Sequence, residues 1–362
     1  MAFRFKLSEP FDEGSRRVAR EQFERAQSQL KTGTDAAVAV HETRKCLKRL
    51  RALLRLIRPA IGDTAFRSEN AHLREIGVML SSARDRHVLI ETITKLEATS
   101  GHDGLGDPVR KLLTEQNGEQ GDDVDAAAMK RALKELDQAQ KRCARLRISG
   151  RGFAVVGGGL EASYRRARRA FHDSYETQTD EAFHEWRKGA QQHWRHMVLL
   201  SRAWTDCMDA RIAEARQLSQ LLGDDHDLAI LAAFVRSERA AAIADENVAL
   251  IEKLARERQA RLRAIARPVG DRLFAEGAKA LRRRMAAYWE AAAAYKEVAN
   301  LNEEKHAAPK PKAAAATKEP CADAPAKASA LTTKTTKATK VASKKPRSRR
   351  PAAKTSDPKT PV

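Results

Sequence analysis

Apolar residues recur every three or four positions through most of residues 14–300, and no stretch alternates apolar and polar residues as a strand would. This spacing gathers the apolar side chains on one face of an α-helix. We therefore expect an all-α chain with helices of roughly 15 to 25 residues. Turn-forming residues divide them at 33–35, 59–63, 100–108, 149–159 and 178–180, and at Pro268.

One pattern occurs twice in the chain. Residues 41–51 read HETRKCLKRLR and residues 184–195 read HEWRKGAQQHWR, so each copy has a histidine three positions before an Arg-Lys pair. About 30 residues later each copy has an arginine, then a leucine six positions on, then a basic residue joined to aspartate. These are Arg74, Leu80 and Arg84-Asp85 in the first copy, and Arg216, Leu222 and His226-Asp227 in the second.

The first copy predicts a helix with a basic face beside an apolar one. An apolar seam, at steps of three and four, is formed by Val40, Thr43, Leu47, Leu50, Leu54 and Ile57. One position on, a second line of residues lies about 100° around the helix. This line, which we call the basic row, consists of His41, Arg44, Lys48, Arg51 and Arg55, with Lys45 and Arg49 beside it. Adjacent like charges repel by a few tenths of a kcal/mol, so the row indicates a binding surface for a polyanion. The alternative is a solvated basic face.

The second copy repeats the seam and only part of the row. Its apolar seam is formed by Phe183, Trp186, Ala190, Met197 and Leu200. His184, Arg187 and Lys188 return in register, but Gln191, Trp194 and Val198 follow, and Arg195 is displaced by one position. We therefore expect a lopsided binding surface in which the first copy dominates.

Charge separates a helical body from a tail. The formal net charge is +20, and residues 305–362 contain 15 basic and 3 acidic residues, or about +12 of that total. Residues 303–362 are rich in Lys, Ala, Pro, Thr and Ser with almost no large apolar residue, so we expect a disordered tail. The tail resembles bacterial linker-histone tails, and this resemblance implies nonspecific binding of DNA or polyphosphate. A tail that only aids solubility is the alternative.

The cysteine spacing and the distribution of apolar residues indicate the cellular compartment of the protein. Cys46, Cys143, Cys207 and Cys321 are far apart and form no redox or metal-ligand spacing. The N-terminus has no apolar run of signal length, and no run of about 18 apolar residues occurs anywhere. We expect a reduced, cytoplasmic protein without a membrane span.

Signatures of catalysis are missing from the sequence. The His226-Asp227 pair suits a divalent metal, but its counterpart is Arg84-Asp85 and arginine is not a ligand. There is no nucleophile elbow, no phosphate-binding glycine loop and no paired-carboxylate motif. We expect a binding protein without metal or cofactor. A metal-dependent phosphate-processing enzyme is the alternative.

The duplicated His-x-x-Arg helices, with the opening Phe3 to Lys6, the segment Ala19 to Gln22 and the segment Leu80 to Val88, resemble the CHAD domain, the conserved histidine α-helical domain. The resemblance covers roughly residues 3–295. It implies two antiparallel helical bundles related by an internal pseudo-two-fold axis within a domain of residues 1–300. We place repeat one at about 10–148, a linker at about 149–159 and repeat two at about 160–297.

The resemblance also implies a ligand, inorganic polyphosphate, bound in a basic cavity, and location at polyphosphate granules of a bacterial cell. Enzymes of polyphosphate metabolism are expected partners, and a nucleoid protein that binds DNA through the tail is the alternative. Position by position, the resemblance assigns binding to His41, Arg44, Lys48, Arg49, Arg51, Arg74, Arg84, His184, Arg187, Arg216 and His226. The helical pattern adds Lys45, Arg55, Lys188 and Arg195.

Overall fold

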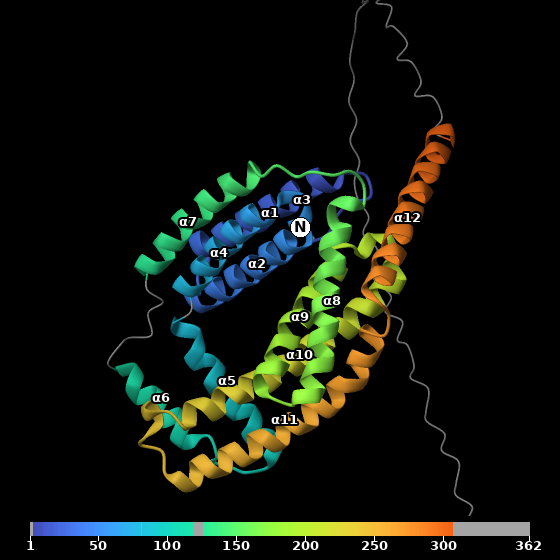
Figure 1. The fold of residues 1–362 in the computed structure, drawn as a ribbon. Coiled ribbons are helices and arrows are strands. Elements are labelled where there is room, and N and C mark those ends of the chain that lie inside the picture. The colour runs from blue at the N-terminus through green and yellow to red at the C-terminus, as the bar shows by residue number, and fades with distance from the viewer. Residues whose placement is uncertain (1–2, 81, 119–125, 307–362) are drawn as a thin grey trace, which may run out of the picture. The chain divides into compact units, whose positions relative to one another are not determined.

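The computed structural model describes residues 3–80, 82–118 and 126–306, and the side chains of all of these except 82–85, 116–118 and 299–306 (Figure 1). These residues belong to one compact unit. They contain α-helices, two short 3₁₀ helices and no strand, so the all-α prediction is confirmed over this part of the chain. The helices are α1 Phe11–Thr32, α2 Ala36–Leu56, α3 Arg58–Ile61, α4 Asp63–Met79, α5 Ser82–Ser100, α6 Asp107–Gly118, α7 Ala126–Ala144, α8 Ala154–Thr177, α9 Asp180–Leu199, η1 Ser201–Ala203, α10 Thr205–Val235, η2 Glu238–Ala240, α11 Asp245–Leu273 and α12 Ala278–His306.

The helices pack around three hydrophobic clusters. Helices α1, α2, α4 and α7 enclose the first, which contains Phe23, Leu50 and Leu73. The second joins the ends of α1 and α2 to α3, α8, α9 and α12 and to parts of α10 and α11. Every residue of both sequence-predicted apolar seams is buried, which confirms that these faces pack inward.

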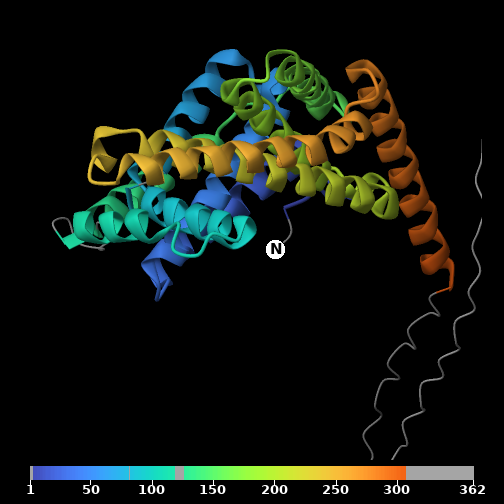
Figure 2. The same ribbon diagram turned by 90° about the horizontal axis from the view of Figure 1, so that it is seen from below.

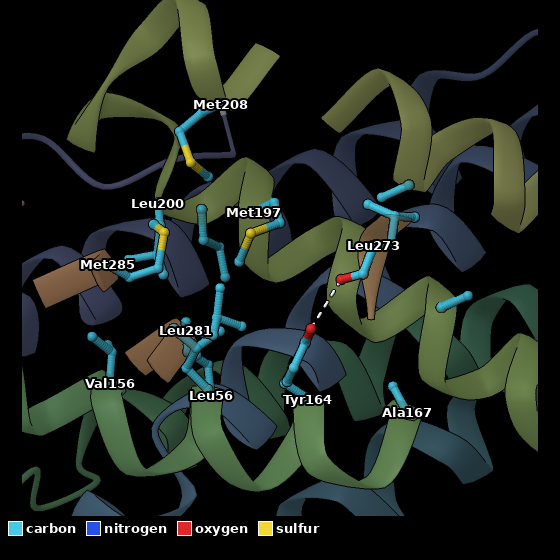
Figure 3. Close-up of a cluster of buried hydrophobic side chains, with 14 of the residues drawn as sticks. Leu56, Val156, Tyr164, Ala167, Met197, Leu200, Met208, Leu273, Leu281 and Met285 are labelled. Atoms are coloured by element: carbon cyan, nitrogen blue, oxygen red, sulfur yellow. Dashed lines mark hydrogen bonds between the residues drawn. The ribbon is translucent and has the colours of Figure 1, made fainter. Parts of the chain in front are cut away.

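The second cluster holds the largest buried side chains of α8 and α9. Trp186 is completely buried there, and Met197, Leu200 and Met285 pack close to one another (Figure 3). The hydroxyl of Tyr164 donates to the carbonyl oxygens of Leu273, at 3.0 Å, and of Glu276, at 3.1 Å. The hydroxyl proton is shared between the two carbonyl oxygens, which satisfies a buried polar group and ties α8 to the end of α11.

The third cluster contains residues from both halves of the chain, so the two repeats do not form two self-contained bundles. Helices α5 and α6 leave the first-half helices and pack on α10 and α11, where Ile93 and Val109 lie in one cluster with Leu231 and Ile251 (Figure 2). The reason is length. Helix α10 has 31 residues, about 46 Å at 1.5 Å per residue, and α11 has 29, so each extends beyond the second cluster and offers a further apolar face. The pseudo-two-fold relation of the repeats stays a prediction.

Several helix boundaries agree with the turn signals. Asp35 caps α2 by accepting hydrogen bonds from the backbone N–H groups of Ala37 and Val38, and Thr179 caps α9 by accepting one from Ala182. The predicted break at Pro268 is wrong, because Pro268 lies inside α11. It is on the exposed side, and the buried residues Ala266 and Val269 hold the helix in the core on both sides of it.

The predicted linker at 149–159 is also wrong over its second half, since α8 begins at Ala154. The glycines there permit close helix packing. A Cβ on Gly159 would lie 1.8 Å from the carbonyl oxygen of Leu56, and one on Gly158 would lie 3.2 Å from the ring of Pro59. Glycine thus lets the backbone of α8 touch the C-terminal end of α2.

Replacing Gly159 with alanine should destabilise the protein, because backbone atoms of α2 cannot yield as a flexible side chain would. We expect a loss of about 1–3 kcal/mol in the free energy of unfolding, measured by urea denaturation. The matched control is Gly223→Ala in α10, where a Cβ would meet nothing within 4 Å. That variant should gain up to about 1 kcal/mol from helix propensity. Equal stability of the two variants would contradict the packing account.

Candidate functional site

The two His-x-x-Arg helices, α2 and α9, contact each other directly. The Nε2 of His196 on α9 lies 3.0 Å from the carbonyl oxygen of Ala52 on α2, and both groups are buried. Burial lowers the pKa of His196 to about 4, so this ring is neutral and acts as a packing group. The contact places the basic residues of α9 next to those of α2.

Arg195 joins the two basic faces. Its side chain is half-buried, donates to the carbonyl oxygen of Gln191 at 2.9 Å and lies over the ring of Trp194. Burial, and then the charges of Arg49, Arg187 and Arg51, lower its pKa to about 10. Arg195 is one position away from the place that the first copy's spacing would give it. In the structure it still lies close enough to Arg49 and Arg51 of the first copy for their charges to lower its pKa.

The far end of the basic row is equally crowded. Arg51 donates from Nε to Oδ1 of Asn70 at 3.0 Å, and its pKa is lowered by burial and then by Arg74. The pKa of Arg55 is lowered to about 10 by burial and then by Arg166, Arg51 and Arg58. Guanidinium groups that repel each other therefore extend from α9 along α2 to α8.

Other predicted site residues also support the fold. Nη1 of Arg44 donates to the carbonyl oxygens of Gly77, at 2.8 Å, and Leu80, at 3.2 Å, which end α4. A cation at this position satisfies free carbonyls and complements the helix dipole. Lys45 pairs with Glu42 at 2.6 Å, and Arg49 donates to Gln22 at 3.3 Å.

The remaining predicted residues differ in exposure. Lys48 and Arg187 are half-buried, while His41, Arg74 and Arg216 are exposed. Lys188 is exposed and pairs with Glu185. The side chain of Arg84 lies outside the described residues.

His184 and His226, one from each predicted motif of the second copy, face each other. Their Nδ1 atoms are 3.1 Å apart and their ring centroids 4.0 Å apart. Burial, and then Arg187, His184 and Lys188, lower the pKa of His226 to about 4, and Asp180 opposes this shift. The pKa of His184 is also lowered, by burial, Lys188 and Arg187. The pair is therefore neutral near pH 7, with one ring donating to the other.

The buried carboxylate of Asp225, the residue before His226, helps to position the His184–His226 pair. Asp225 accepts from Nε of Arg263 at 2.7 Å, and Arg263 also pairs with Asp180 at the start of α9. The same guanidinium lies 4.1 Å from the ring centroid of Phe183. Arg263 thus ties α10 to α9 and sets His226 opposite His184. Burial, which the sequence does not state, distinguishes Asp225 from Asp227 of the repeated motif.

A cavity of about 290 Å³ lies where α2, α3, α4, α8 and α9 converge. Arg55 lines it together with residues that the sequence reasoning did not assign, among them Arg58, Ser163 and Arg166. The four arginines between 165 and 169 were the available signal for Arg166, but their contact with α2 is visible only in the folded chain.

The described residues also bear on metal binding, disulfide formation and membrane insertion. No group of three His, Cys, Asp or Glu side chains among them is arranged to hold a metal ion. Cys46, Cys143 and Cys207 are free thiols. None of the described helices has the length and apolarity that crossing a membrane requires.

Comparison with protein families agrees with the geometry. The model of the CHAD domain matches residues 17–236, more than half of the chain. The chain belongs to the CHAD family. The CHAD domain is known in general as a polyphosphate-binding family. The match is shorter than the span of 3–295 on which the resemblance was drawn, and it includes both His-x-x-Arg helices. Among curated proteins, no significant match was found.

Replacing Arg195 with methionine should stabilise the CHAD domain and weaken its binding of polyanions. Methionine keeps an unbranched chain against Trp194 but removes a charge that its surroundings disfavour. At pH 7 we expect a gain of about 1–3 kcal/mol in the free energy of unfolding, since a pKa unit corresponds to about 1.4 kcal/mol. The gain should shrink above about pH 10, where Arg195 loses its proton in the folded state. Urea titrations at pH 7 and pH 10.5 check this, and a loss of stability at pH 7 would contradict it.

Proposed function

We propose that this CHAD domain binds inorganic polyphosphate along the basic row of α2 and the adjoining part of α9. The observation that carries the proposal is a set of half-buried arginines, Arg51, Arg55 and Arg195, that have no ion-pair partner among the described residues. Buried charge without compensation costs free energy. A bound polyanion would offset that cost, so the arrangement favours a ligand of repeating negative charge.

The aromatic residues favour a ligand without bases. Guanidinium groups already cover the nearby rings: Arg49 lies over Phe3, Arg55 over Phe66 and Arg195 over Trp194. Rings covered in this way offer no stacking platform to single-stranded nucleic acid. Arginine can donate two bonds to one phosphate, which suits a ligand recognised by charge and oxygen geometry alone.

Binding without catalysis is part of the proposal. A phosphate-processing activity would need metal-binding carboxylates beside the row, and Glu42, the residue after His41, pairs with Lys45 and Arg25. Incubation of the protein with polyphosphate and Mg²⁺ or Mn²⁺ should release no orthophosphate above the rate of a buffer control.

The tail would add affinity without specificity, because a chain with about +12 net charge neutralises any polyanion close to it. Location at polyphosphate granules and contact with enzymes of polyphosphate metabolism follow from the same binding. The alternative, a nucleoid protein, would bind duplex DNA through the tail.

A competition titration tests the proposal against this alternative. Labelled long-chain polyphosphate is bound to the full chain and to a chain ending at Ala308, and is then displaced by unlabelled polyphosphate or duplex DNA. We expect polyphosphate to displace it at concentrations at least tenfold lower than DNA in both proteins. Equal displacement by the two polymers from the shorter protein would overturn the proposal.

Removing two charges from the basic row should weaken polyphosphate binding and flatten its dependence on salt. Charge-assisted bonds contribute about 1.5–3 kcal/mol each, so Lys48→Gln with Arg51→Gln should raise the Kd at least a hundredfold. The matched control is Lys130→Gln with Lys134→Gln, which removes the same charge from exposed positions of α7. Fluorescence titrations between low and moderate salt measure both effects. A row variant that keeps its helical circular dichroism and binds like the control would show that the row is only a solvated face.

Polyphosphate affinity should rise as pH falls below neutral, because a bound anion raises the pKa of the neutral His184–His226 pair. His226 has a pKa of about 4 in the unliganded protein. One proton taken up on binding increases affinity by up to about tenfold per pH unit below the bound-state pKa, until the free pKa is reached. Calorimetric titrations from pH 8 to pH 5 measure this slope. His226→Asn should lose most of it, while His87→Asn, at an exposed position of α5, should keep it.

A further inference from the structure

The cavity at the C-terminal end of α2 gathers arginines from three separate helices. Arg55 comes from α2, Arg58 from α3 and Arg166 from α8, and all three line the cavity with Ser163 and Gln192. Gly159 and Gly189 also line it, so backbone rather than bulky side chains forms part of the wall. This volume is therefore positively charged and continuous with the basic row through Arg55.

The charges around this cavity do not balance. Asp63 is the carboxylate that lines it, and Arg58 already holds both of its oxygens, with Nε–Oδ1 at 2.7 Å and Nη2–Oδ2 at 2.9 Å. Arg166 is exposed and has no ion pair among the described residues; Glu185, which it influences electrostatically, accepts a hydrogen bond from Lys188. Arg55 likewise has no ion pair in the described part of the chain. Two guanidinium charges therefore remain uncompensated at one small volume.

Two of the residues that line this cavity have buried polar atoms without partners. The Nε of Arg55 and the Oε1 of Gln192 are buried and make no hydrogen bond. An unsatisfied buried donor or acceptor costs about 1–3 kcal/mol. A ligand that brings negative charge to the guanidinium of Arg55 would offset part of this cost, and a phosphate group does so.

Charge and connectivity distinguish the two kinds of phosphate in a linear polyphosphate. An internal phosphate carries about one charge and continues the chain on both sides. A terminal phosphate carries close to two charges at neutral pH, since a phosphate monoester has its second pKa near 6, and it continues the chain on one side only. Two uncompensated guanidinium groups match the terminal group.

We propose that this cavity holds the terminal phosphate of linear polyphosphate, with the chain running from it along α2 toward Arg44. Arg44 and Arg55 are eleven positions apart in α2, about 16 Å along the helix. The inference rests on the proposed polyphosphate binding and adds recognition of the chain end to it. Arg55 and Arg166 bind the terminal oxygens, and Ser163 and Gln192 face the same group.

Chemical blocking of the ends tests this. The full chain is titrated with a short linear polyphosphate, and with the same polymer after both terminal phosphates have been converted to phosphoramidates, which lowers their charge and adds bulk. We expect the blocked polymer to bind at least tenfold more weakly. Arg166→Gln should bring the affinity for the unblocked polymer down to that of the blocked one. Arg169→Gln makes the same charge change at an exposed position of α8 that does not line the cavity, and it should keep the tenfold preference.

Each other result overturns the inference in a recognisable way. Tight and equal binding of both polymers would remove end recognition and leave polyphosphate binding intact. Binding of neither polymer would overturn both proposals together. If orthophosphate bound with an affinity that Arg166→Gln abolished while the two polymers remained equal, the cavity would serve free phosphate rather than a chain end. Circular dichroism of both variants establishes that any change is not unfolding.

Discussion

The contact between the C-terminal end of α2 and helices α8 and α9 is the constraint on which the basic site depends. Gly159 brings the backbone of α8 against Leu56, and His196 bonds to Ala52, about one turn of α2 before Arg55 and the cavity. Because these contacts are made by backbone and buried groups, they fix the helix positions without regard to surface charge. The arginines carried on the outer faces then lie close to one another.

Hydrophobic burial therefore supports an electrostatic arrangement that is unfavourable in itself. Two of these arginines, Arg55 and Arg195, have a pKa of about 10, well below the usual value for arginine, because each is half-buried among like charges. In many proteins such charges are neutralised by acids, and this chain does so elsewhere, as Arg263 with Asp180 and Asp225 illustrates. The difference between the two places suggests that the unpaired arginines serve a ligand rather than the fold, at some cost in stability.

The sequence was sufficient for the all-α class and for the faces that α2 and α9 bury, but not for helix lengths, since α3 has 4 residues and α10 has 31 where 15 to 25 were expected. Spacing at steps of three and four, with one step of seven in the second copy, predicted both apolar seams, and the repeated motif named both His184 and His226. Contacts between residues that are far apart in the sequence could not be predicted from this spacing. Nothing local in Gly159 distinguishes a linker from a close helix contact, and Pro268 reads as a break until the buried residues on either side of it are known. Arg166 and Asp225 acquire their roles only from partners more than 30 residues away.

The packing of α5 and α6 on α10 and α11 has a consequence for biosynthesis. The apolar residues between 89 and 113 are buried by residues 228–262. More than a hundred further residues must therefore be synthesised before α5 and α6 can bury their apolar faces. At 5–20 residues per second, that interval lasts roughly 5 to 30 seconds. During it the apolar faces of α5 and α6 lack the partners that bury them in the folded domain.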